Sequence, residues 1–295
     1  MAITFEKFKT FAQKFGVEFI CDQEEQTYGF EGVAGLNLRN AIEYLQLLLQ
    51  QIRSSEAIYV PQALLFAGPP GTGKSFLIKA FAKEMGWCLL KLVSKWRTCW
   101  NSEQILEMAL WIIETTQPCI VWIDQIDMEW SGQWNTRLSN DISISGRIIG
   151  RLLEAIRSVK HGRKILWIGE STCPDILPLN CFPVLIPFLH PSTREIQMLL
   201  PVLARQVGRE LAEDVNTFEI AQILSHSLIT VRVLQEVISV ARFFADTETE
   251  QPGTPIRQRH LPRAACEFKP NYNFLVHEYI ALTALRMYSF PFLLP

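Results

Sequence analysis

GPPGTGKS, at residues 68–75, is the stretch of this sequence that decides the fold. It fits the pattern G-x-x-x-x-G-K-[ST], and it lies between the apolar run Ala63–Ala67 and a helical pattern at 74–85. Glycines let the backbone wrap closely around phosphate oxygens, and the positive end of the following helix adds to that attraction. The stretch therefore predicts a phosphate-binding loop between a buried strand and a helix.

The predicted loop assigns a role to each of its polar residues. Lys74 is placed to reach the β- and γ-phosphates of a nucleotide, and the Ser75 hydroxyl is placed to ligate Mg²⁺. The residues predicted to contact the nucleotide here are Pro69, Pro70, Gly71, Thr72, Gly73, Lys74, Ser75 and Phe76.

Strand and helix patterns alternate on both sides of this loop. Helices are predicted at 37–53, 74–85, 102–116 and 143–159, and strands at 63–67, 87–93, 119–123, 164–169 and 183–189. Short apolar strands that alternate with helices predict an α/β fold, a parallel sheet covered by helices on both faces in three layers.

From Pro191 the pattern becomes helical. Helices are predicted at 192–208, 215–225, 229–245 and 273–289, with a polar, Pro-rich connector at 246–263. We expect an N-terminal helical extension at 1–28, an α/β core at 29–190, and a helical lid with a C-terminal extension at 191–295. The phenylalanines of 4–16 and the end Phe290–Pro295 are expected to pack on the chain's own core; docking of a partner is the alternative.

Composition limits the class of function. With 48% hydrophobic residues in 295, the chain can bury a sizeable core. Lys and Arg total 28 against 30 Asp and Glu, which argues against holding nucleic acid by bulk positive charge. Binding of nucleic acid by a local basic strip remains an alternative, at Lys95 with Arg97 or at Arg257–Arg263.

The cysteines and apolar runs indicate a compartment. Seven dispersed cysteines without a C-x-x-C pair are typical of reduced thiols rather than of a disulfide frame or a zinc site. No apolar run has the roughly 20 residues of a membrane helix, and the N-terminus does not resemble a secretory signal. We therefore expect a cytoplasmic protein.

A second acidic motif follows the phosphate loop. The apolar run Cys119–Ile123 ends at Asp124, which is placed to hold the magnesium shell. Such a carboxylate at the end of a buried strand, some 50 residues after the loop, completes the predicted site for a nucleotide with its metal ion.

Over roughly 30–245 the sequence resembles the AAA family of ATPases. Val33–Leu36 looks like the family's entry segment, GPPGTGKS is its form of the phosphate loop, and Trp122–Asp127 looks like its second motif. The resemblance implies binding of ATP or ADP with Mg²⁺, adenine contacts at Ala34 and Gly35, metal contacts at Ser75 and Asp124, and a homo-oligomer, ring or helical. It also implies ATP hydrolysis.

The match fails at positions that serve hydrolysis. Gln125 stands where the family has its glutamate, and an amide can hydrogen-bond the attacking water but cannot accept its proton. Thr172 stands at the family's sensor asparagine, and 171–189 contains neither Arg nor Lys where the family has its trans-acting arginines. Hydrolysis is therefore expected to be slow or blocked.

Other arginines are candidates for the missing charge. Arg232 resembles the lid arginine that contacts the γ-phosphate of its own subunit, with a solvated helix residue as the alternative. Arg147 and Arg151, at helical spacing in 145–156, could act across a subunit interface or could be an ordinary solvated face.

Tryptophans mark the candidate contact with a protein partner. Trp96 and Trp100 occupy the region that forms the pore loop in ring-forming relatives, and core packing or a subunit contact is the alternative. Three functions follow: an ATPase that remodels or organises a protein partner, a scaffold locked by ATP without hydrolysis, and a nucleic-acid-associated loader.

Overall fold

The computed structural model describes residues 4–20, 29–30, 33, 38–54, 60–93, 101–127, 142–158, 164–225, 229–249, 253–269 and 272–294. A six-stranded sheet in the order β1-β3-β4-β5-β2-β6 forms its centre. The strands are β1 Val17–Ile20, β2 Ala63–Ala67, β3 Cys88–Leu92, β4 Cys119–Ile123, β5 Ile165–Ser171 and β6 Val184–Pro187. Strands β2 to β6 pair in parallel, which confirms the predicted α/β class.

Helices cover both faces of this sheet. On one face α2 (Arg39–Arg53) and α3 (Lys74–Met85) pack against apolar side chains of the strands. On the other face lie α1 (Phe5–Lys14), α4 (Ser102–Thr115) and α6 (Ile142–Arg157). Every residue of β2 and of β4 is buried, as expected for central parallel strands between two helical layers.

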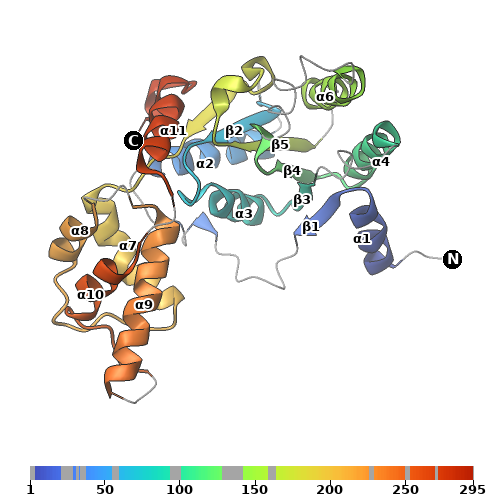
Figure 1. The fold of residues 1–295 in the computed structure, drawn as a ribbon. Coiled ribbons are helices and arrows are strands. Elements are labelled where there is room, and N and C mark those ends of the chain that lie inside the picture. The colour runs from blue at the N-terminus through green and yellow to red at the C-terminus, as the bar shows by residue number, and fades with distance from the viewer. Residues whose placement is uncertain are drawn as a thin grey trace.

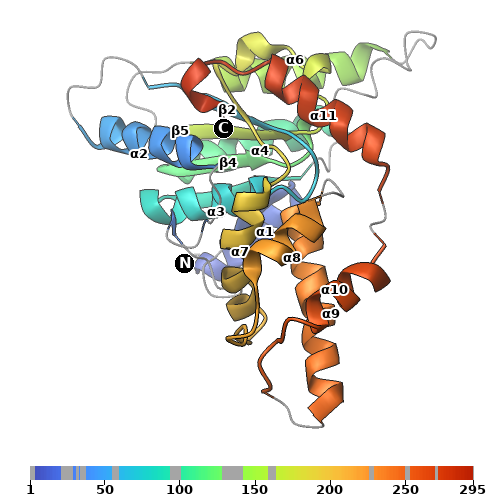
Figure 2. The same ribbon diagram turned by 90° about the vertical axis from the view of Figure 1, so that its left-hand side faces the viewer.

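Four helices form a separate lid beside the core (Figure 1). They are α7 Thr193–Gln206, α8 Thr217–Ser225, α9 Val231–Thr249 and α10 His260–Glu267, and they share an apolar core of their own. Figure 2 shows the same four helices below one end of the sheet. A capping box, in which Ser192 and Glu195 bond reciprocally, begins α7.

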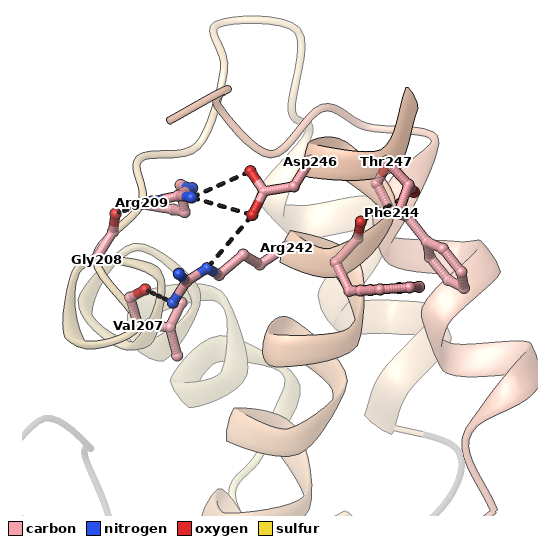
Figure 3. Close-up of polar contacts among 8 residues, drawn as sticks. Val207, Gly208, Arg209, Arg242, Phe244, Asp246 and Thr247 are labelled. Atoms are coloured by element: carbon pink, nitrogen blue, oxygen red, sulfur yellow. Dashed lines mark hydrogen bonds and ion pairs between the residues drawn. The ribbon is translucent and has the colours of Figure 1, made fainter. Parts of the chain in front are cut away.

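One carboxylate ties the turn after α7 to α9 (Figure 3). Asp246 accepts two hydrogen bonds from Arg209 Nη2, at 3.1 and 3.0 Å, and Arg242 Nε lies 3.7 Å from Asp246 Oδ2. Arg242 also donates to the Val207 carbonyl at 2.7 Å. The lid is thus held by polar contacts at its periphery as well as by its apolar centre.

The structure differs from the sequence prediction at two places. Val17–Ile20 adds an antiparallel edge strand against β3, in a segment predicted as helical. In the predicted connector 246–263, α9 continues to Thr249 and α10 begins at His260. Helix α10 has only eight residues and buries three of them in the lid, so its apolar periodicity is too short to recognise in the sequence.

The C-terminal segment returns to the core. Helix α11 (Phe274–Arg286) buries Ala284 in the core cluster that α4 and α6 share, and the Ser289 hydroxyl accepts a hydrogen bond from the Leu185 backbone at 2.6 Å. The short helix η6 (Pro291–Leu293) buries Leu293 on the α2 face. Among the described residues, no helix combines the length and apolar character needed to cross a membrane.

Candidate nucleotide-binding site

The phosphate-loop sequence forms a closed turn between β2 and α3. Lys74 Nζ donates to the carbonyls of Gly68 and Pro69, each at 2.8 Å, and the Thr72 hydroxyl donates to the Pro69 carbonyl at 2.8 Å. Lys74 is only 6% exposed, and burial lowers its pKa to about 8 although nearby carboxylates oppose the shift. The loop thus holds an ammonium group at the N-terminus of α3, where both the lysine and the helix end would attract a phosphate.

A cavity of about 420 Å³ lies beside this loop, between the core and the lid. Its volume falls in the range of small-molecule and cofactor sites. Predicted site residues that line it are Pro70, Gly71, Thr72, Gly73, Lys74, Ser75, Phe76, Asp124, Gln125, Thr172 and Arg232. Ala34, Gly35, Trp96 and Trp100 lie outside the described residues.

The lid touches the phosphate loop at Gly71. The Arg232 backbone donates to the Gly71 carbonyl at 3.1 Å, and Thr230 lies beside it. Gly71 has φ +81°, and a Cβ there would lie 2.9 Å from Thr230 Oγ1 and 3.1 Å from Arg232 Cβ. The Arg232 side chain is 78% exposed and lies 3.3 Å from Glu236. The Arg232 backbone therefore joins the lid to the loop, and Arg232 is also one of the residues that line the cavity.

The carboxyl ends of β4 and β5 bring two acidic residues to the face that α3 covers. Asp124 directly follows β4 and lies 2.9 Å from Lys91 Nζ, whose charge also lies over the Trp122 ring. Glu170, near the end of β5, accepts a hydrogen bond from the Ser75 hydroxyl at 3.2 Å. Burial raises the pKa of Glu170, and the charge of Lys74 opposes that rise.

Glu170 was not among the predicted site residues. The signal available in the sequence was a carboxylate inside the otherwise apolar strand pattern, which ends in Gly169-Glu170-Ser171. A buried strand rarely carries an acidic residue unless that residue has a partner.

Thr172, at the predicted sensor position, binds a carboxylate of the second motif. Its hydroxyl donates to Asp127 Oδ2 at 2.7 Å, and the backbone amides of Thr172 and Cys173 donate to the same oxygen at 3.3 and 3.2 Å. Asp127 Oδ1 is buried without a partner in the described part of the chain. Thr172 therefore anchors the turn after β5 to the turn after β4, next to the cavity.

Gln125 lies in an unusual backbone conformation. With φ +50° it is, among the residues that the structure describes, the one non-glycine with a positive φ. It is exposed and lines the cavity. Such conformations cost roughly 1–3 kcal/mol and cluster at functional sites.

The other candidate arginines take part in ion pairs within the chain. Arg151 bonds to Glu107 and Glu154, and Arg147 Nε lies 3.4 Å from Glu103. The pairs with Glu107 and Glu103 connect α6 to its neighbour α4, whereas the pair with Glu154 lies within α6. In the segment 257–263, Arg259 lies 2.7 Å from Glu248 and Arg263 lies 3.3 Å from Glu267.

The oxygen ligands near the loop suit magnesium. No group of three or more His, Cys, Asp or Glu residues gathers as a metal site within the described ranges. Magnesium does not require one, because it keeps several waters and is usually bound by one or two carboxylates and the phosphates of a substrate. Ser75 and Asp124 would hold it here, and the ion would neutralise charge on the phosphates.

Comparison with known proteins agrees with this geometry. Residues 64–182 match the model of the ATPase family associated with various cellular activities (AAA). The chain is 28% identical over 227 residues to a proteasome-activating nucleotidase of Methanospirillum hungatei, which covers 72% of this chain and 53% of the relative. It is 25% identical over 213 residues to a cell division cycle protein 48 homolog of Archaeoglobus fulgidus, covering 65% and 27% respectively.

A solved structure, the crystal structure of the FIGL-1 AAA domain, has the same fold. It superposes with a TM-score of 0.72 over 97% of each chain, at 16% sequence identity. The two curated relatives extend well beyond the part matched here, which spans about a quarter of one and about half of the other. The chain therefore has the fold of an AAA domain, and its residues 64–182 match the AAA family model.

Proposed function

We propose that this chain binds ATP with Mg²⁺ and uses ATP-dependent assembly to remodel or organise a protein partner, with slow hydrolysis. The cavity between phosphate loop and lid carries this proposal, because a nucleotide bound there would touch both parts and favour their closed arrangement. Lys74 and the α3 N-terminus would bind the phosphates. Assembly into a homo-oligomer and action on a protein are inferred from the AAA relatives.

The proposal of slow hydrolysis rests on Gln125. Its side chain can orient a water molecule but cannot take a proton from it, so the site would hold ATP longer than a glutamate-bearing site would. The arginine-free stretch 171–189 acts in the same direction, since an arginine that reaches the γ-phosphate contributes roughly 10³–10⁵ in rate in related enzymes.

The same residues favour a second candidate, a scaffold that ATP locks without turnover. A ligand that prefers one conformation stabilises it by binding alone, and no hydrolysis is needed. The two functions differ in whether ATP is consumed when the missing carboxylate is restored.

The test is steady-state phosphate release at several protein concentrations, for the natural sequence and for Gln125→Glu. Gln222→Glu, on the exposed surface of α8, is the matched control for the added charge. Remodelling predicts that Gln125→Glu turns over ATP, faster per subunit at higher concentration. If Gln125→Glu binds ATP but releases no phosphate, the remodelling function is refuted and the ATP-locked scaffold is supported. Turnover of the natural sequence near the enzyme median of about 10 s⁻¹ would refute slow hydrolysis.

A further inference from the structure

Glu170 is a buried carboxylate at the nucleotide site that no recognised motif of the sequence explains. It is 5% exposed, and its Oε1 has no hydrogen-bond partner among the residues described. Its other oxygen, Oε2, accepts the hydroxyl of Ser75, the residue predicted to ligate magnesium. Glu170 also lines the cavity beside the phosphate loop.

The sheet register explains why Glu170 reaches this point. Phe66, one residue before the end of β2, pairs with Glu170, so the carboxylate lies beside the strand that leads into the phosphate loop. On its other side, Ile123 pairs with Gly169, which places Asp124, directly after the end of β4, next to Glu170. Neighbouring strands lie about 5 Å apart, so two carboxylates flank the N-terminus of α3.

These two carboxylates have different partners. Asp124 is held by Lys91 at 2.9 Å, whereas Glu170 is held by Ser75 at 3.2 Å. The nearby ammonium of Lys74 donates to the carbonyls of Gly68 and Pro69. The carboxylate that touches the magnesium-ligating hydroxyl is therefore Glu170, and Asp124 must share its charge with a lysine.

Burial of such a group has a cost that a ligand would offset. A buried carboxylate loses its hydration, and an oxygen without a partner pays the full penalty of that loss. A divalent cation at Ser75 would bring positive charge and bound water to this oxygen. The residues around it, a serine hydroxyl and two carboxylates, are the hard oxygen groups that magnesium prefers.

We propose that Glu170 is a second carboxylate of the magnesium–nucleotide site, which orients the Ser75 hydroxyl and completes the polar shell of the cation with Oε1. This inference rests on the proposed function, because it requires that ATP binds at the phosphate loop. It also gives a reason for an acidic residue inside a buried strand.

The experiment is the affinity of a fluorescent ATP analogue, measured with Mg²⁺ and with EDTA, for the natural sequence, E170Q and E219Q. Glutamine keeps the shape of residue 170 and can still accept the Ser75 hydroxyl, but it loses the charge. Mg²⁺ should raise the affinity for the ATP analogue about tenfold less in E170Q than in the natural sequence. In EDTA the two proteins should bind the analogue with the same affinity. E219Q, on the exposed side of α8, should behave as the natural sequence does.

Two further measurements keep the inference open to refutation. The affinity for Mn²⁺ in the presence of the nucleotide, measured by electron paramagnetic resonance, should be lower in E170Q. If E170Q fails to fold, E170D keeps the charge but withdraws it from Ser75, and it should also lose Mg²⁺-dependent affinity.

The outcomes separate this inference from the proposed function. A natural sequence that binds no ATP in either condition overturns both. If Mg²⁺ raises the affinity of the natural sequence and of E170Q by the same factor, the role of Glu170 is refuted and the proposed function stands.

Discussion

Replacing Gly71 by alanine tests the contact between phosphate loop and lid. Gly71 has φ +81°, and a Cβ there would meet Thr230 Oγ1 at 2.9 Å and Arg232 Cβ at 3.1 Å. Real Cβ atoms essentially never approach another atom to 2.9 Å, and 3.1 Å is tighter than most of their contacts, so Thr230 or the start of α9 must move. The Arg232 amide, which donates to the Gly71 carbonyl, moves with them.

The magnitude follows from two separate costs. An alanine in the left-handed region costs roughly 1–2 kcal/mol in backbone strain. Overpacking at a tight contact costs roughly 1–3 kcal/mol more. Gly86→Ala provides the matched control, because Gly86 has φ +67° at the end of α3 but nothing within 4 Å of the added Cβ. The free energy of unfolding should thus fall by about 1–3 kcal/mol more in Gly71→Ala than in Gly86→Ala.

The assay is urea unfolding of both variants, together with hydrogen exchange at the Arg232 amide. We expect Gly71→Ala to show the larger loss of stability, faster exchange at Arg232, and weaker ATP binding, because the lid no longer meets the loop. Equal losses of stability in the two variants, with unchanged protection of the Arg232 amide, would refute the reasoning that the lid seats on Gly71.

Three other predictions concern groups around the site. Thr172→Val should lower the free energy of unfolding by about 1–3 kcal/mol, because buried Asp127 loses a hydrogen-bond donor. Thr172→Ser keeps the hydroxyl, so its free energy of unfolding, measured in urea, should stay near that of the natural sequence. Lys74→Met should abolish the rise in melting temperature that ATP causes, and a retained rise would place the nucleotide elsewhere. Burial, and to a smaller extent the charge of His277, lower the pKa of His190 from 6.5 to about 4. Between pH 6.5 and pH 4 the unfolded chain therefore binds a proton that the folded chain does not. Stability should therefore fall as pH drops through this window, and His190→Gln should flatten the fall in thermal unfolding from pH 7 to 4; an unchanged slope would contradict the assignment.

Much of the core was predictable because its signals are local. The buried strands 63–67 and 119–123 and the helix 74–85 have the bounds that the apolar patterns predicted. A phosphate loop needs its glycines, lysine and serine in one short stretch, so its identity can be read without knowledge of any distant contact.

Elements with weak local signals were not predictable. The edge strand Val17–Ile20 has four residues and gains its order from pairing with β3. Helix α10 gains its order from the lid core, where Leu261 and Ala264 are buried. Short elements of this kind depend on tertiary packing more than on their own propensity.

The sequence alone is enough to predict an α/β core that carries a phosphate-loop motif and is followed by helices, because these signals are local. It also places Gln125 where the AAA motif that it resembles has a glutamate. Only the tertiary structure decided which side chains meet there. Ser75 and Glu170 are 95 residues apart in the chain, and they touch because β5 inserts between β4 and β2. Strand order depends on packing across the whole sheet, and no local pattern records it.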